Sequence, residues 1–125
     1  DLDAIAAFLG QAYWSHTRSR DTIKRSLQGS LNFGIYDRCK QTGFGRVISD
    51  YATFAWLCDV FIYDANRGLG LGKWLLSATL AHPDLQGMRR WLLATRDAHG
   101  LYQQFGYQTL QSPERWMEKF NPDAT

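Results

Sequence analysis

The sequence contains few of the residues from which disulfide or metal frameworks are built. It has two cysteines, Cys39 and Cys58, which form no Cys-x-x-Cys pair and are too few for a disulfide framework. Its three histidines, at positions 16, 82 and 99, are scattered and lack the spacing of zinc ligands. We therefore expect no structural metal.

The sequence also lacks the charge excess and the long apolar runs that mark other classes of protein. Its 14 basic and 12 acidic side chains give a net charge of +2, too small by itself to indicate a nucleic-acid-binding surface. No apolar run approaches the roughly 20 residues that a membrane-spanning helix needs. The start, Asp1-Leu2-Asp3, is acidic and has no basic region of a signal peptide. We expect a cytoplasmic protein that binds neither nucleic acid nor a membrane.

Apolar residues are plentiful. They make up 45% of the 125 residues and aromatic residues make up 14%, against 21% charged residues. This composition is typical of a folded globular protein, and the length suits one domain better than two. Without repeats, low-complexity tracts or a linker, the chain is expected to form a single domain over residues 1–125.

The hydrophobic pattern predicts a mixed α/β fold. In chain order we expect helices over 3–14 (capped by Asp3) and 19–28, strands over 31–36, 44–48 and 54–63, a helix over 73–81, a buried strand over 90–94, a helix over 98–105, and closing strands over 107–110 and 116–120. The order gives an early hairpin and a late strand–helix–strand unit. Ligands of such sheets bind at the carboxyl ends of strands, here after residue 63.

A glycine-rich loop follows that strand directly. The segment Asn66-Arg67-Gly68-Leu69-Gly70-Leu71-Gly72-Lys73 alternates glycines between two cations and leads into a helix. Glycines let several backbone N–H groups point into one space, and a helix N-terminus adds a positive dipole end. The loop is therefore predicted to bind a phosphate or pyrophosphate. The alternative is a tight strand-to-helix turn without a ligand.

Two common phosphate motifs do not fit this loop. A Walker A loop requires Gly-Lys followed by Ser or Thr, whereas Gly72-Lys73 precedes Trp74. A dinucleotide fingerprint requires Gly-x-Gly-x-x-Gly. If the pattern starts at Gly68, Lys73 occupies its last glycine position, and if it starts at Gly70, Leu75 occupies that position, so neither alignment fits.

A third pattern does fit: Arg-x-x-Gly-x-Gly at Arg67, Gly70 and Gly72. It resembles the pyrophosphate loop of the GNAT superfamily, the acyl-CoA-dependent N-acetyltransferases. The later segment from Ala98 to Tyr107 is similar to that family's Ala-x-x-Leu-Tyr-x-x-x-Gly-aromatic motif. The two motifs occur in the family's order and at its separation.

The resemblance implies a fold, an activity and a co-substrate. The fold is a central mixed, mostly antiparallel sheet flanked by helices, with a V-shaped splay between the strands over 54–63 and 90–94. The family's first strand usually precedes the first helix, whereas this sequence starts on that helix at Asp1; either the N-terminus is trimmed or the strand is missing. The activity is transfer of an acetyl group from acetyl-CoA to a primary amine of a small molecule, by direct attack in a ternary complex. A non-catalytic acyl-CoA-binding module on the same fold is the alternative, and an unrelated nucleotide-binding protein is a third. A homodimer is compatible with the family.

The resemblance also carries binding residues to this chain. The strand backbone at Val60, Phe61 and Ile62 would hold the pantetheine arm. The loop would hold the pyrophosphate without a metal, through Arg67, Gly68, Leu69, Gly70, Leu71, Gly72 and Lys73. Thr95 stands where many members have an asparagine that contacts the pantetheine.

Two residues are candidates for the chemistry. Tyr102 matches the family tyrosine that protonates the departing thiolate. Asp59 interrupts an apolar strand and is the candidate base that takes a proton from the amine; the alternative is a structural acceptor for backbone N–H groups or for an arginine. His99 is a second candidate base and more simply an exposed helix residue. Cys58 is interpreted as a buried small residue, because no histidine is placed to activate it.

The acceptor site is expected between the first helices, their loop and the C-terminal strands. The residues available there are Tyr13, Trp14, His16, Arg18, Arg20, Phe33 and Trp116. Arg18 and Arg20 would suit a carboxylate or phosphate on the acceptor, or would simply form a solvated basic loop. A peptide N-terminus, a polyamine, an amino acid and an antibiotic all remain open as acceptors.

Overall fold

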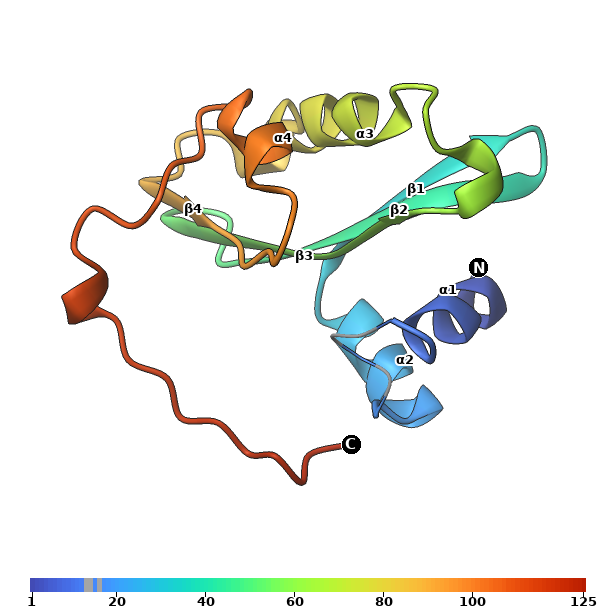
Figure 1. The fold of residues 1–125 in the computed structure, drawn as a ribbon, viewed down its shortest axis with the longest axis horizontal. Coiled ribbons are helices and arrows are strands. Elements are labelled where there is room, and N and C mark those ends of the chain that lie inside the picture. Colours follow the sequence, from blue (N-terminus) through green and yellow to red (C-terminus); the bar gives the residue numbers. More distant parts are fainter. Residues whose placement is uncertain (13–14, 16) are drawn as a thin grey trace.

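A four-stranded sheet forms the centre of the protein. The computed structural model describes residues 1–12, 15 and 17–125. The strands are β1 (Leu31–Asp37), β2 (Lys40–Ser49), β3 (Phe54–Ile62) and β4 (Arg90–Leu92), in the order β1-β2-β3-β4. The β1–β2 and β2–β3 pairs are antiparallel and the β3–β4 pair is parallel, which confirms the predicted mixed, mostly antiparallel sheet (Figure 1).

Helices cover both faces of this sheet. Helices α1 (Leu2–Leu9) and α2 (Arg20–Gln28) lie on one face, and α3 (Leu71–Leu80) and α4 (His99–Gln103) lie on the other (Figure 1). Asp1, and not Asp3 as predicted, caps α1, because its side chain accepts a hydrogen bond from the Ala4 N–H at 3.2 Å. The helix ends at Leu9, earlier than predicted, since the following Gly10 is a poor helix former. Tyr13 and Trp14, which end the predicted helix, lie outside the described residues.

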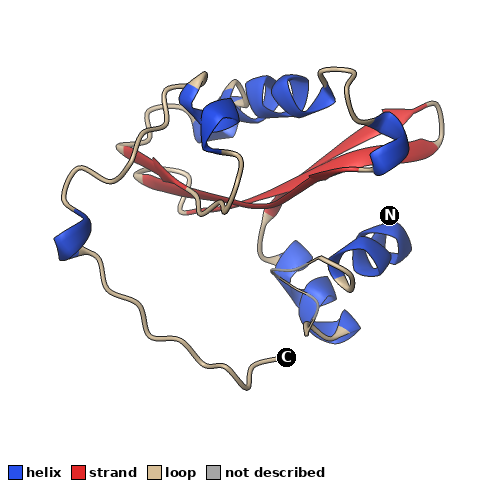
Figure 2. Cartoon of the chain, viewed as in Figure 1, coloured by secondary structure: helices blue, strands red, loops and turns tan. Residues whose placement is uncertain are grey.

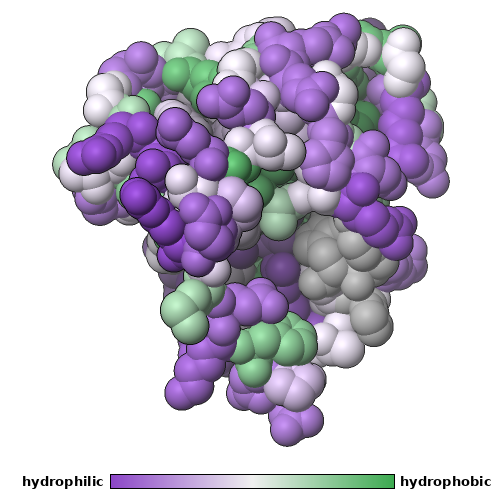
Figure 3. Space-filling model, turned by 60° about the vertical axis from the view of Figure 1, so that its left-hand side comes forward, coloured by the Kyte–Doolittle hydropathy of each residue, from purple (hydrophilic) through white to green (hydrophobic). Residues whose placement is uncertain are grey.

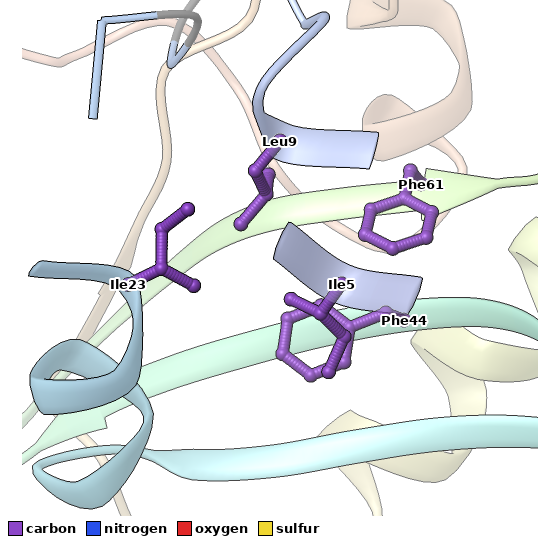
Figure 4. Packing of buried hydrophobic residues seen from close by; sticks show 5 residues of the cluster. All are labelled: Ile5, Leu9, Ile23, Phe44 and Phe61. Carbon is purple, nitrogen blue, oxygen red and sulfur yellow. The ribbon is translucent and has the colours of Figure 1, made fainter. Parts of the chain in front are cut away.

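Two clusters of buried apolar side chains hold the helices to the sheet. Ile5 and Leu9 of α1 and Ile23 of α2 pack against Phe44 and Phe61 (Figure 4). On the other face, the core consists of Val47, Ala55, Leu57, Leu76 and Leu85. The two faces follow from the alternation of side chains along β2 and β3, which a bulge interrupts between Phe44 and Arg46.

β3 and β4 diverge after a short paired segment. Only Phe54, Ala55 and Trp56 pair with β4, opposite Arg90, Trp91 and Leu92. Beyond Trp56, β3 continues to Ile62, and no strand of the described residues pairs with it on that side, so its backbone edge is open there over residues 57–62. The predicted V-shaped splay is confirmed. A strand is present where one was predicted over 90–94, but it ends at Leu92. The expectation that it is buried is wrong, because Arg90 is exposed and Trp91 and Leu92 are half-buried.

The C-terminal arm, defined here as residues 107–125, contains no strand. The predicted strands over 107–110 and 116–120 are wrong, because neither segment has a neighbouring strand to pair with, and the 3-10 turn Pro113–Arg115 is the arm's only regular element. Apart from this turn, Figure 2 shows the arm as a loop that leaves the body of the molecule. Among the described residues, no helix is both long and apolar enough to cross a membrane.

Candidate active site

The splay between β3 and β4 opens into a cleft of about 750 Å³. This volume lies within the range of small-molecule and cofactor sites, roughly 300–1,000 Å³. Its walls are β3 from Trp56 to Ile62, the glycine-rich loop, the segment after β4, and α4. Of the site residues predicted from the sequence, the cleft is lined by Asp59, Val60, Phe61, Ile62, Arg67, Gly68, Gly70, Leu71, Gly72, Lys73, Thr95 and Tyr102. Leu69 is the exception: it is 70% exposed and does not line the cleft.

The backbone of the glycine-rich loop is arranged as an anion receptor requires. Gly68 and Gly70 have φ angles of 81° and 77°, in the left-handed region that favours glycine. Gly70 is the N-cap of α3 and offers no side-chain cap to the first amides of that helix. A Cβ atom added at Gly68, Gly70 or Gly72 would meet no atom within 4 Å. The helix N-terminus therefore faces open space with its amides available.

The two loop cations lie at this end of the cleft, but one already has a partner. Arg67 forms an ion pair with Asp64 at 2.9 Å, and its Nε donates to the Ile62 carbonyl at 3.2 Å. These contacts hold Arg67 against the end of β3. Lys73, in the first turn of α3, is exposed and lines the cleft.

Asp59 lines the cleft from β3 and belongs to a buried charge cluster. Its Oδ2 accepts hydrogen bonds from Arg18 Nη1 at 2.7 Å and from Arg46 Nε at 3.0 Å. The side chains of Asp59, Arg46 and Arg18 are 1%, 9% and 25% exposed. Both guanidinium groups stabilise the ionised carboxylate. Asp59 therefore accepts hydrogen bonds from arginines, as the structural alternative to a catalytic base predicted. The catalytic role of Asp59 stays a prediction.

A backbone irregularity places this carboxylate. In the β2–β3 register Arg46 lies opposite Cys58 and Phe44 opposite Phe61, so β3 carries a bulge around Asp59. Asp59 has a φ angle of 54°, uncommon for a residue with a side chain but better tolerated by Asp and Asn than by most residues. Such bulges redirect a side chain and often occur beside active sites.

Arg46 is the site residue that the sequence reasoning missed. It is buried on β2, and its Nη1 also donates to Ser30 Oγ at 2.9 Å. The signal available in the sequence was an arginine among the apolar residues and glycine of the predicted strand over 44–48. Nothing in the spacing linked it to Asp59, because the contact depends on how β2 and β3 pair.

Tyr102 lines the cleft from α4, on the side of the sheet that α3 covers. Its ring makes an edge contact with Tyr107, with centroids 5.7 Å apart. The Tyr107 hydroxyl is buried and has no hydrogen-bond partner among the described residues. Burial, and then the neighbouring Tyr102, raise the pKa of Tyr107 above its usual value. Tyr107 therefore stays a neutral phenol beside Tyr102.

The other candidates for chemistry are placed less favourably. His99 is exposed at the start of α4 and does not line the cleft. Cys58 does line it, but burial raises the pKa of the thiol to about 11, so the nucleophilic thiolate is scarce at neutral pH. Cys58 is half-buried and not fully buried as expected, but its thiol is placed as poorly for nucleophilic chemistry as the sequence indicated.

The residues expected to form an acceptor site separate in space. Arg18 alone among the described members lines the cleft. Arg20 pairs with Asp3 on the surface, Phe33 packs on the α3 side beside His82, and Trp116 lies in the arm over Arg90. Tyr13, Trp14 and His16 lie outside the described residues. Within the part of the chain that the structure describes, no group of three metal-ligating side chains gathers.

Comparison with known proteins places this cleft in a family. The family model described as an acetyltransferase (GNAT) domain matches residues 29–109. A Gibberella zeae protein described as a candidate acetyltransferase is 30% identical over 124 residues, covering 81% of this chain and 69% of the relative. The chain therefore belongs to the GNAT family of acetyltransferases, whose co-substrate is acetyl-CoA.

Solved structures agree with this assignment. The crystal structure of a candidate GNAT acetyltransferase from Xanthomonas campestris is 45% identical, with a TM-score of 0.95 over 98% of this chain and 87% of the other. That alignment leaves out only a few residues and so includes most of the C-terminal arm. The ribosomal-protein-S18-alanine N-acetyltransferase of Escherichia coli, 21% identical over 85% of this chain and 70% of its own, has a TM-score of 0.69 and shares the fold.

Proposed function

We propose that residues 1–125 act as a single N-acetyltransferase domain that transfers an acetyl group from acetyl-CoA to a primary amine of a small molecule, by direct attack in a ternary complex. The observation that supports this most is one cleft lined by the glycine-rich loop, the open edge of β3 and Tyr102. An extended thioester that carries a pyrophosphate needs an anion site for the pyrophosphate, a backbone edge for its arm and a proton donor near its sulfur.

The residues present fit acetyl-CoA. The uncapped amides at Gly70–Gly72 and the side chain of Lys73 suit the pyrophosphate, because backbone donors and a helix N-terminus stabilise an anion without a metal. The backbone edge of Val60–Ile62 is free on the cleft side to accept a pantetheine arm as an added strand. When bound, acetyl-CoA supplies the activated acetyl group.

Tyr102 is proposed as the general acid. Its position on the cleft wall allows its O–H to donate a proton to the sulfur that leaves, which stabilises the departing group. Because Tyr107 beside it stays neutral, Tyr107 places no negative charge next to the Tyr102 hydroxyl.

Asp59 is proposed as the candidate base, with a positioning role as the alternative. Its place in the cleft favours the first role, and its ion pairs with Arg18 and Arg46 favour the second. The roles predict different kinetics for Asp59→Asn, assayed below its melting temperature. Loss of a general base lowers kcat by about 10²–10⁴-fold, whereas loss of positioning mainly raises the KM of the amine.

The charge cluster favours an acceptor that carries an anionic group. Arg18, Arg46 and Asp59 together hold one net positive charge, and Arg18 is the member that reaches the cleft. Its bond to Asp59 engages Nη1, and no other described residue accepts a hydrogen bond from its side chain. The remaining guanidinium donors suit a carboxylate or a phosphate. An amino acid therefore fits the cleft better than a polyamine.

The test is Tyr102→Phe with Tyr107→Phe as the matched control, since both changes remove one hydroxyl from adjoining rings. Thiol release is followed over a panel of amines, together with acetyl-CoA binding by calorimetry. We expect Tyr102→Phe to lower kcat by about 10²–10⁴-fold with unchanged acetyl-CoA affinity, and Tyr107→Phe to keep its turnover. Equal turnover in both variants would remove Tyr102 from the mechanism. Binding without turnover on any amine would favour the non-catalytic alternative.

A further inference from the structure

The glycine-rich loop has large apolar side chains exposed on both sides of its amides, outside the cleft. Leu69 is 70% exposed and Trp74 is 61% exposed. Neither lines the cleft, although residues 70–73 between them all do. Exposure alone does not distinguish this pair, because protein surfaces carry scattered apolar groups. The face seen in Figure 3, from nearer the β4 side, is mostly hydrophilic and shows hydrophobic atoms in several places. What distinguishes Leu69 and Trp74 is their position beside the loop.

The first turn of α3 places Trp74 next to the N-cap of the helix. Its N–H donates to the Gly70 carbonyl at 3.1 Å, so Trp74 follows Gly70 by one helical turn (Figure 1). The buried residues of α3 are Leu75, Leu76 and Thr79, which face the sheet. Trp74 therefore lies on the outer side of the helix, at its glycine-rich end.

The direction of helical side chains brings the indole ring close to the loop. In an α-helix the Cα–Cβ bonds tilt toward the N-terminus, so a side chain covers the turn before its own Cα. The ring of Trp74 therefore leans over the turn that begins at Gly70. Gly70 and Gly72 bring no side chains there, and the neighbours in the next turn, Ser77 and Ala78, are small. One face of the ring is left uncovered beside the loop amides.

Acetyl-CoA extends beyond its pyrophosphate. The pyrophosphate joins the pantetheine arm to an adenosine, so an arm that lies along β3 directs the adenosine out of the cleft past the loop. This step rests on the proposed function. Residues 66–73 include no aromatic side chain on which the base could stack. The aromatic side chains that line the cleft belong to α1, β3 and α4, and they are Phe8, Trp56, Phe61 and Tyr102.

We propose that the indole of Trp74 is the platform on which the adenine ring of acetyl-CoA stacks, with Leu69 bordering the nucleoside from the other side of the N-cap. Stacking on an aromatic ring uses the π face that every base has and requires no polar partner, which suits an exposed indole. The proposal also gives a role to Leu69, which the family resemblance places in the binding loop although its side chain does not line the cleft.

The platform adds to the sites for the pyrophosphate and the pantetheine arm and does not replace them. ATP carries the adenine ring but has no arm to pair with the edge of β3. It therefore still binds too weakly to stabilise the protein, and the platform favours acetyl-CoA over acetyl thioesters that lack the nucleotide.

Calorimetry with two thioesters tests the platform. Acetyl-CoA and acetyl-4′-phosphopantetheine, which has the thioester and the arm but no adenosine, are titrated against the wild type, Trp74→Ala, Trp74→Phe and the control Phe120→Ala. Alanine is a good helix former and Trp74 is exposed, so the fold is kept. Trp74→Ala should weaken acetyl-CoA binding by about 10–100-fold and leave acetyl-4′-phosphopantetheine binding unchanged. Trp74→Phe keeps a ring and should retain most of the affinity.

The control Phe120→Ala removes another exposed ring, from the C-terminal arm, and should bind both thioesters as the wild type does. Unchanged acetyl-CoA affinity in Trp74→Ala would overturn the proposal. Equal weakening of both thioesters would also overturn it, because the ring would then act on the loop and not on the adenine. A wild type that binds neither thioester would contradict the proposed function as well. A wild type that binds acetyl-CoA no more tightly than acetyl-4′-phosphopantetheine would contradict the platform alone.

Discussion

Removing the charge of Asp59 should destabilise the fold far more than removing that of a surface aspartate. Asp59→Asn keeps the size of the side chain but leaves Arg18 and Arg46 without their shared carboxylate. Breaking a buried ion pair by removing one partner costs about 3–5 kcal/mol. We assign most of this to Arg46, because Arg18 is 25% exposed and solvent screens its share. At about 3–6 °C per kcal/mol for a chain of this length, the melting temperature should fall by roughly 10–25 °C.

The matched control is Asp21→Asn. Asp21 also pairs with an arginine, Arg25, at 3.1 Å, but its side chain is 78% exposed. An exposed pair of this kind contributes about 0.3–0.5 kcal/mol, and its place in the first turn of α2 adds a similar amount. Thermal unfolding followed by circular dichroism, at equal protein concentration, compares the two. Melting temperatures of the two variants within about 3 °C of each other would show that the Asp59 cluster is not a buried, interdependent unit.

Two further predictions concern the acceptor and the response to acid. Arg18→Gln should raise the KM for a carboxylated amine by about 10–100-fold, as expected for loss of a charge-assisted hydrogen bond. The KM for the same amine without the carboxylate should barely change. Equal changes in the two KM values would exclude recognition of the anionic group by Arg18. Asp50 accepts hydrogen bonds from the Thr53 hydroxyl and from the N–H groups of Thr53, Ala52 and Phe54, and these bonds lower its pKa, the Thr53 hydroxyl most. Asp50 therefore contributes to stability above the ordinary carboxyl pKa of 3.8, and this contribution is lost as the pH falls below that value. Below about pH 4, the urea midpoint of Asp50→Asn should consequently fall less steeply with pH than the urea midpoint of the wild type. Parallel pH profiles would contradict this assignment.

Much of the fold could be predicted from local signals. The hairpin, the apolar strand at 54–62 and the helix after the glycines each have a pattern that does not depend on the rest of the chain. The loop is predictable for the same reason, because Gly68 and Gly70 need positive φ angles that few other residues adopt. Tyr102 was found through its place in a motif, and its position on the cleft wall agrees with that motif.

What the sequence did not predict depends on contacts between distant residues. Arg46 reaches Asp59 only because β2 and β3 pair with a bulge between them, and no pattern within either strand specifies that register. The arm has apolar residues in a strand-like pattern, yet a strand requires a paired neighbour, and no described strand pairs with the arm. Likewise, Arg18 and Arg20 are nearly adjacent in sequence, but one lines the cleft and the other pairs with Asp3 on the surface.

Gly72→Asp tests whether the glycine-rich loop binds the pyrophosphate of acetyl-CoA, as the proposed function requires. A Cβ at Gly72 meets no atom within 4 Å, and an acidic residue in the first turn of α3 favours the helix, so the fold should be kept. The same carboxylate would repel a pyrophosphate. Acetyl-CoA, CoA and ATP are each titrated against the wild type, Gly72→Asp and the control Gly72→Ala, with thermal stability as the readout. We expect acetyl-CoA and CoA, but not ATP, to stabilise the wild type and Gly72→Ala by about 2.7 kcal/mol at 100 times the dissociation constant. Gly72→Asp should not be stabilised by any of the three. Equal stabilisation of Gly72→Asp and Gly72→Ala by acetyl-CoA, or none in the wild type, would contradict binding of the pyrophosphate by the loop.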